Sequence, residues 1–171
     1  MKMQDRKQIR LRDYDYSSSG AYFITVCIKD RHIHLSEIAE TVGDGAHDVP
    51  QVSLTKTGKI VEKYLLSSEN ISGVKIEKYI IMPDHIHAII ILDSDKFANK
   101  NQGTSKAPSP TNEMLPHIIS TFKRFCNRDV GQNIFQRSYI EHIIRDEQDF
   151  ERKWNYICDN PRRWAEKRTN K

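Results

Sequence analysis

Apolar and β-branched residues gather in short runs that predict strands. Residues 21–29 (AYFITVCIK) form the first of these runs, and such a composition is typical of a strand. Two more runs, 74–82 and 85–92, are separated only by Pro83 and Asp84. Because so short a connection suits only neighbouring strands that run in opposite directions, the two runs predict an antiparallel hairpin.

Three other segments carry apolar residues at helical spacing. The first helix is expected to begin near Thr55, although Gly58 weakens its first turn. The third should open at Asp146 and stop at Asn160, because a following proline disfavours the helical conformation. The second covers 114–128 and should face the core with five apolar side chains, namely Leu115, Ile118, Ile119, Phe122 and Phe125.

Strands grouped around helices, with a hairpin in the middle, predict an α+β fold in which an antiparallel sheet has helices packed on one face. The 171 residues contain no internal repeat and fit one domain, 1–171. Within it, residues 94–112 are rich in Ser, Asn, Gly, Lys and Pro, which predicts a flexible loop. Residues 1–19 and 165–171 are expected to be peripheral tails.

Composition narrows the class of protein. Charged residues make up 29% and apolar residues 37% of the chain, the balance of a soluble globular protein. A formal net charge of +4 permits a polyanionic partner without requiring one. The apolar runs are too short to span a membrane and the first ten residues are polar, so we expect no membrane span and no secretory signal. Three cysteines without a CxxC pair favour a reducing cytoplasm.

The hairpin carries a histidine pair. Residues i and i+2 of a strand point to one face, so His85 and His87 should lie side by side, with Ile86 buried behind them. Two neutral imidazoles at this spacing can share one divalent cation. The alternative is two polar residues on a solvated strand face. His32 and His34 have the same spacing but no apolar run after them, which indicates a surface turn.

The last predicted helix carries Tyr156 and Asn160. Positions i and i+4 lie on one helix face, about 6 Å apart, so the two side chains should project together. An amide oxygen can be a third ligand for a cation, and a phenol could reach a phosphate bound to that cation. The alternative is a half-buried tyrosine and a helix-ending asparagine. Tyr139, in an extended segment, is the competing candidate nucleophile.

Three motifs in this order resemble one known family. They are YIIMPDHIH at 79–87, FQRSYIEHIIRDE at 135–147 and YICDNP at 156–161. Together they are similar to the REP-associated tyrosine transposases, a family of single-tyrosine HUH transposases, and the resemblance extends from about Gly20 to about Trp164. It implies a ferredoxin-like or RRM-like sheet that carries the histidine pair, with the tyrosine helix close by.

The resemblance also implies roles for four residues and two kinds of partner. His85 and His87 match the metal ligands, Asn160 the position that completes the metal site, and Tyr156 the nucleophile. The implied ion is Mg²⁺ or Mn²⁺, whereas two imidazoles alone would favour Zn²⁺. The implied partners are single-stranded DNA with hairpin-forming, REP-like palindromes and a second copy of the chain. Many relatives have Asn where this chain has Asp84.

Basic residues are frequent in the last third of the chain. Four of them are the candidate DNA contacts, Lys123, Arg124, Arg137 and Arg162; the wider group adds Arg128, Arg145 and Arg163. Such residues can neutralise phosphates, while tyrosine or tryptophan rings can stack on unpaired bases. Solvated helix faces paired with nearby acidic residues are the alternative for any single one.

The sequence thus predicts a metal-dependent endonuclease and strand transferase for single-stranded DNA, acting through a covalent 5′-phosphotyrosine. Two alternatives from other classes stay open. One is an RRM-like module that binds structured nucleic acid without cutting it. The other is a metal-dependent hydrolase of small phosphates, for which Tyr156 would be irrelevant.

Overall fold

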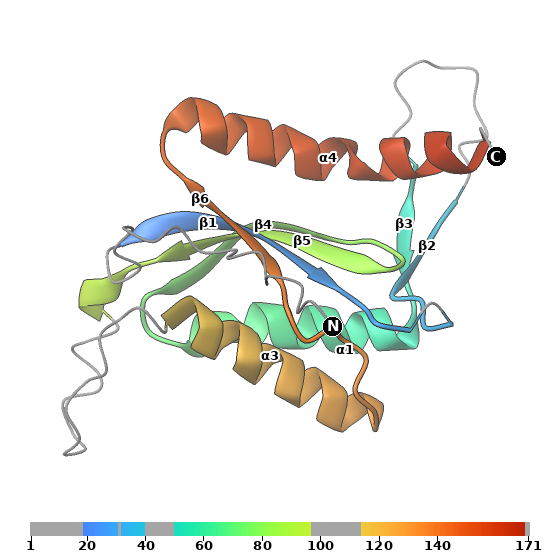
Figure 1. Cartoon of the computed structure of the whole chain (residues 1–171), viewed down its shortest axis with the longest axis horizontal. Helices are drawn as coiled ribbons and strands as arrows, with labels where there is room; N and C mark the ends of the chain where they lie inside the picture. Colours follow the sequence, from blue (N-terminus) through green and yellow to red (C-terminus); the bar gives the residue numbers. More distant parts are fainter. Residues whose placement is uncertain (1–18, 31, 40–49, 97–113, 170–171) are drawn as a thin grey trace, which may run out of the picture.

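A four-stranded antiparallel sheet lies between helices in the computed structural model of the chain (Figure 1). The structure describes residues 19–30, 32–39, 50–96 and 114–169. The sheet has the order β4-β5-β1-β6, and every neighbouring pair is antiparallel. Its strands are β1 (Gly20–Cys27), β4 (Val74–Ile81), β5 (His85–Leu92) and β6 (Ile140–Ile144).

The chain order confirms the predicted fold class. Helix α1 (Lys56–Ser67) connects β1 to β4, and α3 (Met114–Val130) connects β5 to β6. A 3₁₀ turn, η1 (Ser68–Asn70), follows α1. The resulting βαββαβ order with the first and third strands in the centre of the sheet is the ferredoxin-like arrangement. The hairpin predicted at Pro83 and Asp84 is the β4–β5 pair.

Helices α1 and α3 cover one face of the sheet (Figure 1). The large core lies between them and the sheet, and Val61 and Leu65 of α1 are almost fully buried in it. The predicted inward face of α3 is confirmed at Leu115, Ile118, Ile119 and Phe122, with Met114 and Cys126 buried beside them. Phe125 was expected in that core but is only half-buried, because its ring stacks on Tyr64 of α1 instead.

Helix α4 (Glu147–Thr169) lies across the opposite face of the sheet (Figure 1). The expectation that helices occupy one face is therefore wrong for α4, although it holds for α1 and α3. A second, smaller core explains the placement: Ile157 of α4 is buried against Phe23 of β1 and Ile89 of β5. The sheet has apolar residues on both faces, so each face needs a cover.

Helix α4 begins as predicted but ends later. The Asp146 side chain accepts a hydrogen bond from the backbone N–H of Asp149 at 2.7 Å and so caps the first turn. The predicted stop at Asn160 is wrong, because the helix continues through Pro161 to Thr169. A proline inside a helix removes one backbone hydrogen bond. Pro161 is buried, and packing against the rest of the molecule offsets that loss. Residues 165–169, expected in a tail, belong to this helix.

Two short strands lie between β1 and α1 in the chain. β2 (Ser36–Ile38) pairs with β3 (Val52–Leu54) in an antiparallel ribbon. Three-residue strands are too short to show an alternation of polar and apolar positions. The tail at 1–18 and most of the 94–112 loop lie outside the described residues. Within the described ranges, no helix is long and apolar enough to cross a membrane.

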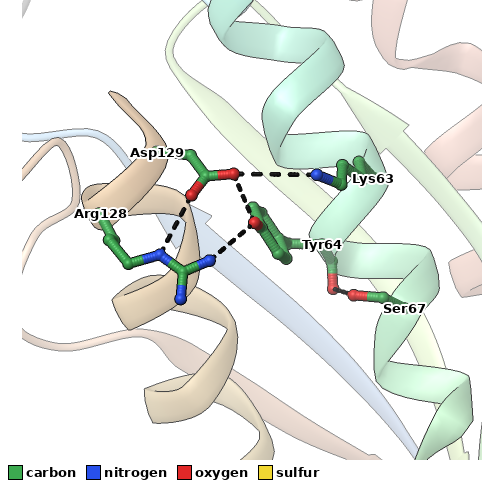
Figure 2. A network of polar contacts seen from close by, with 5 residues as sticks. All are labelled: Lys63, Tyr64, Ser67, Arg128 and Asp129. Carbon is green, nitrogen blue, oxygen red and sulfur yellow. Dashed lines mark hydrogen bonds and ion pairs between the residues drawn. The ribbon is translucent and has the colours of Figure 1, made fainter. Parts of the chain in front are cut away.

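A polar network joins α1 to α3 on the surface (Figure 2). The hydroxyl of Tyr64 donates to the carboxylate of Asp129 and accepts from the guanidinium of Arg128 at 3.1 Å. Lys63 is 3.8 Å from the same carboxylate, and Ser67 donates to the carbonyl of Tyr64. The charges are exposed, so each ion pair adds little to the free energy of unfolding. Together the contacts link α1 to α3.

Candidate active site

The turn between β4 and β5 is held by backbone hydrogen bonds from elsewhere in the chain. The N–H of Leu35 donates to the carbonyl of Pro83 at 2.9 Å, and the N–H of Ile28 donates to the carbonyl of Asp84 at 3.0 Å. Each bond ties the turn to a segment about fifty residues earlier in the sequence. His85, the next residue, therefore starts β5 from a fixed position.

The histidine pair lies on one face of β5, as the i, i+2 spacing predicts. The ring centroids of His85 and His87 are 4.5 Å apart. His85 is half-buried, whereas His87 is only 4% exposed. Ile86 points the other way and is fully buried in the large core. His32 and His34 are exposed in a turn, as predicted for the pair without a strand behind it.

Each imidazole of the pair uses its Nδ1 atom for a protein partner. His87 Nδ1 is 2.9 Å from the hydroxyl of Thr25 on β1, the strand residue directly opposite. His85 Nδ1 is 2.5 Å from a carboxylate oxygen of Asp84. The Nε2 atom of His87 is buried, and no hydrogen bond to it is found among the described residues. A buried nitrogen without a partner costs about 1–3 kcal/mol, so Nε2 of His87 is a candidate ligand atom.

The surroundings of His87 keep it neutral. Burial, and then the neighbouring His85, lower the pKa of His87 to about 3. The ring of Phe23 stacks on it at a centroid distance of 5.2 Å and an angle of 24°. A neutral imidazole held in a fixed plane is the form that binds a metal ion.

Tyr156 lies beside this pair in the same chain. Its ring centroid is 5.1 Å from that of His87, at an angle of 70°. Tyr156 and Asn160 line one cleft of about 610 Å³ together with His85 and Asp84. The prediction that the i, i+4 pair projects together is confirmed. Asn160 is 6% exposed, and His87 lies behind the residues that line the cleft.

The rest of the cleft is mainly basic and aromatic, with one carboxylate, that of Glu166. The guanidinium carbon of Arg163 is 5.3 Å from the ring centroid of Tyr156. Arg162 and Lys167 also line the cleft, as does Trp164, whose ring centroid is 6.1 Å from that of His85. These residues come from the part of α4 beyond Pro161, where no helix was expected. The cleft is therefore suited to a phosphate group with an attached ring.

The competing tyrosine lies on the other face of the sheet. Tyr139 packs against the large core, near α3, and therefore cannot share a site with the histidine pair. It lines a separate hollow with Lys123, Arg124 and Arg137. The ammonium of Lys123 donates to the carbonyls of residues 136, 137 and 138 at 2.9, 3.4 and 3.2 Å. The expected basic cluster is thus divided between the two faces of the sheet. The ammonium of Lys123 is already hydrogen-bonded to backbone carbonyls.

The donor set fits a divalent cation. Among the described residues, no three His, Cys, Asp or Glu side chains gather closely enough to hold a metal, so a site here needs a ligand of another type. The amide of Asn160 in the same cleft offers one. The unpartnered Nε2 of His87 offers another donor, and His85 has its Nε2 left over after bonding to Asp84. Two imidazoles and an amide oxygen are acceptable ligands for Mn²⁺ and related ions.

Sequence reasoning missed the partners of the two histidines. Thr25 stands 62 residues before His87, and only the β1–β5 register brings them together. Asp84 stood out only as a departure from the family pattern; its carboxylate bonds to the ring of His85. Trp164 was missed as part of the site because the helix was expected to end before it. Arg163 was expected only as one of a wider group of basic residues and was not placed beside Tyr156.

No family model matches the chain, but individual relatives indicate its family. An uncharacterized protein of Haemophilus influenzae is 30% identical over 175 residues, which cover 94% of this chain and 91% of that protein. A second protein of that organism, provisionally named a REP-associated tyrosine transposase, is 25% identical over 149 residues, or 86% of this chain and 73% of the relative.

The chain is related to the REP-associated tyrosine transposases. A solved structure of a family member bound to a REP hairpin has the same fold. It covers 90% of this chain and 73% of its own, with a TM-score of 0.60 at 21% identity. The resemblance drawn from the three sequence motifs is confirmed at the level of the family, and with it the class of enzyme, a transposase.

Proposed function

We propose that this protein nicks and rejoins single-stranded DNA next to hairpin-forming repeats, with Tyr156 as the nucleophile. The observation that carries the proposal is the meeting of Tyr156, His85 and Asn160 around one cleft, with His87 directly behind them. The solved family member is bound to a REP hairpin, which supports a DNA hairpin as the partner of this chain too.

In the proposed reaction the phenolic oxygen of Tyr156 attacks the phosphorus of a DNA phosphodiester. The bond from phosphorus to the 3′ oxygen breaks, the 3′ oxygen takes up a proton, and the proton of the phenol goes to solvent. The product is a 5′-phosphotyrosine and a free 3′-hydroxyl. Attack of a 3′-hydroxyl on that ester reverses the step, so rejoining needs no nucleotide cofactor.

His85, His87 and Asn160 would hold the divalent cation, for which we propose Mg²⁺ or Mn²⁺. A bound cation supplies polarisation of the scissile phosphate and neutralises its charge. The chain contributes the rest. Arg163 lies over the ring of Tyr156, where its guanidinium can stabilise negative charge on the phenolic oxygen and on the phosphate.

The DNA contacts fall into two groups. Arg162 lines the cleft and is only loosely paired with Asp159 at 3.3 Å, so we propose that it binds a phosphate near the cleavage point. Arg124 and Arg137 line the hollow on the α3 side, where they can bind the backbone of a hairpin stem. Lys123 would act there indirectly, by holding the segment that carries Arg137. The homodimer implied by the resemblance stays a prediction.

An RRM-like binding module is disfavoured by the position of α4. Modules of that type stack bases on the open face of the sheet, whereas α4 packs across that face here and buries Phe23. The remaining alternative, a hydrolase of small phosphates, would turn over mononucleotides without any need for Tyr156.

The test is a covalent adduct. With a labelled single strand that bears a hairpin and with Mn²⁺, the wild type should yield a protein–DNA species that survives a denaturing gel. Tyr156→Phe should lose the adduct and the cleavage by several orders of magnitude while it still binds the hairpin. Tyr139→Phe is the matched control and should form the adduct. An adduct with Tyr156→Phe but not with Tyr139→Phe would reassign the nucleophile, and turnover of mononucleotides by Tyr156→Phe would favour the hydrolase.

A further inference from the structure

The two histidines have different hydrogen-bond partners, and the difference has chemical consequences. The Nδ1 atom of His85 faces a carboxylate, Asp84, at 2.5 Å. The Nδ1 atom of His87 faces a hydroxyl, Thr25, at 2.9 Å. A neutral imidazole carries one proton, on either nitrogen, and only the other nitrogen can bind a metal.

We propose that Asp84 and Thr25 are positioning residues that direct the Nε2 lone pair of each histidine toward the cation. The proposal rests on the metal site described under the proposed function. It assigns to each of the two residues a separate task. Asp84 sets which nitrogen of His85 is protonated, and Thr25 orients the ring of His87.

The case for Asp84 follows from what a carboxylate can do. A carboxylate accepts hydrogen bonds and donates none, so the proton between it and His85 sits on Nδ1. The lone pair of neutral His85 is then on Nε2. The Asp84 side chain is half-exposed, but its backbone carbonyl is fixed by the N–H of Ile28. In its neutral form, His85 therefore has the tautomer that can bind a cation through Nε2.

The case for Thr25 is one of orientation. A hydroxyl can accept from Nδ1–H or donate to bare Nδ1. Thr25 can therefore hydrogen-bond to either tautomer of His87, including the one that leaves the Nε2 lone pair free for a cation. Two side chains fix the ring of His87 in place. Thr25 is directly opposite it in the β1–β5 register, and Phe23 stacks on its face. The β-branched side chain of a threonine has few rotamers, and His87 is 4% exposed. Its Nε2 therefore points in one direction, and no hydrogen bond to that atom is found among the described residues.

The first experiment reads the tautomer of His85 in the metal-free protein, with long-range ¹H–¹⁵N correlation at neutral pH. We expect the Nδ1–H form in the wild type and in Asp84→Asn, whose amide oxygen still accepts. Asp84→Ala should change to the Nε2–H form that free histidine favours. An Nε2–H form in the wild type, or an unchanged Nδ1–H form in Asp84→Ala, overturns the role of Asp84.

The second experiment measures the Mn²⁺ affinity of the same proteins by calorimetry. Loss of a group that orients a metal ligand costs about 10- to 100-fold in affinity, and we expect that loss in Asp84→Ala and in Thr25→Val. Thr25→Ser and Asp84→Asn keep the hydrogen bond and should restore most of the affinity. Thermal unfolding should be unchanged in all four variants, which separates positioning from a general loss of structure.

Two failures can be told apart. A wild type that binds no Mn²⁺ overturns the metal site, and the positioning proposal with it. A wild type that binds Mn²⁺ no more tightly than Thr25→Val leaves the metal site intact and overturns the role of Thr25 alone.

Discussion

Gly58, in the first turn of α1, occupies a position where a distant segment of the chain leaves no room for a side chain. A Cβ atom at this position would lie 1.9 Å from the backbone carbonyl oxygen of Leu35. That oxygen also accepts from the N–H and the hydroxyl of Thr55, the N-cap of the helix. The glycine that weakens the helix in the sequence is therefore the residue that allows the helix to sit against the chain leading into β2.

We expect Gly58→Ala to lower the free energy of unfolding by about 1–3 kcal/mol through overpacking. Alanine has the higher helix propensity, by about 1 kcal/mol, so propensity alone predicts the opposite sign. Urea denaturation measures the difference. Gly131→Ala is a suitable control, because that glycine has φ +81 and no atom within 4 Å of an added Cβ; it should show backbone strain alone, of about 1–2 kcal/mol. A Gly58→Ala variant as stable as the wild type contradicts the proposed clash.

At the scale of elements, an ion pair joins α4 to the edge strand β6. His142 Nε2 is 2.7 Å from the carboxylate of Asp149. Asp149 is buried, and Arg152 also approaches its carboxylate, at 3.5 Å. Burial alone would raise the pKa of Asp149. The hydrogen bond from His142 and its charge, with smaller contributions from hydrogen bonds to the backbone of Arg145 and the side chain of Arg152, outweigh this and hold the pKa of that carboxyl below its usual value.

This pair should contribute to stability in mild acid. Because the pKa of Asp149 is lowered in the folded state, its contribution is present above the unfolded value of about 3.9 and is lost as the pH falls through the folded value. Without His142, the folded pKa rises and the loss begins at higher pH. His142→Ala should therefore move the acid-unfolding midpoint, followed by circular dichroism, to higher pH. His117→Ala, at an exposed position on α3, is the control; an equal shift in both variants would mean that Asp149 is not the cause.

At the scale of the whole molecule, the sheet has two unequal cores. The larger one, under α1 and α3, holds most of the buried apolar side chains. The smaller one, under α4, has three buried members among the described residues, namely Phe23, Ile89 and Ile157. The catalytic tyrosine of the proposed function is thus carried by the element with the smaller buried attachment, on the face that also bears the histidines.

Ile157→Ala should therefore loosen α4 before it affects the sheet. Removing a buried isoleucine costs about 2–5 kcal/mol, and a local opening of α4 needs only the smaller core to separate. Hydrogen exchange should show faster exchange in α4 with protection kept in β1 and β5, together with reduced adduct formation by Tyr156. Ile118→Ala, in the larger core, should instead lower protection throughout. Equal loss of protection in both variants would show a single cooperative unit.

Local spacing was enough to predict several features of the fold and the site. Side chains two apart in a strand share a face, so the sequence alone placed His85 beside His87 with Ile86 on the far side. Side chains four apart in a helix share a face, so it also placed Tyr156 beside Asn160. Both results follow from backbone geometry that neighbouring residues determine. The β4–β5 hairpin followed in the same way from its two-residue connection.

Only the tertiary structure decided what depends on contacts between distant segments. The sheet face that α4 covers put Tyr156, and not Tyr139, beside the histidine pair. The β1–β5 register put Thr25 against His87, and burial carried α4 past Pro161 to bring Arg163 and Trp164 to the cleft. No local pattern encodes these choices, because each is fixed by the free energy of packing two segments far apart in the chain. The sequence determined the chemical groups and their local pairs, and the fold determined which pairs meet.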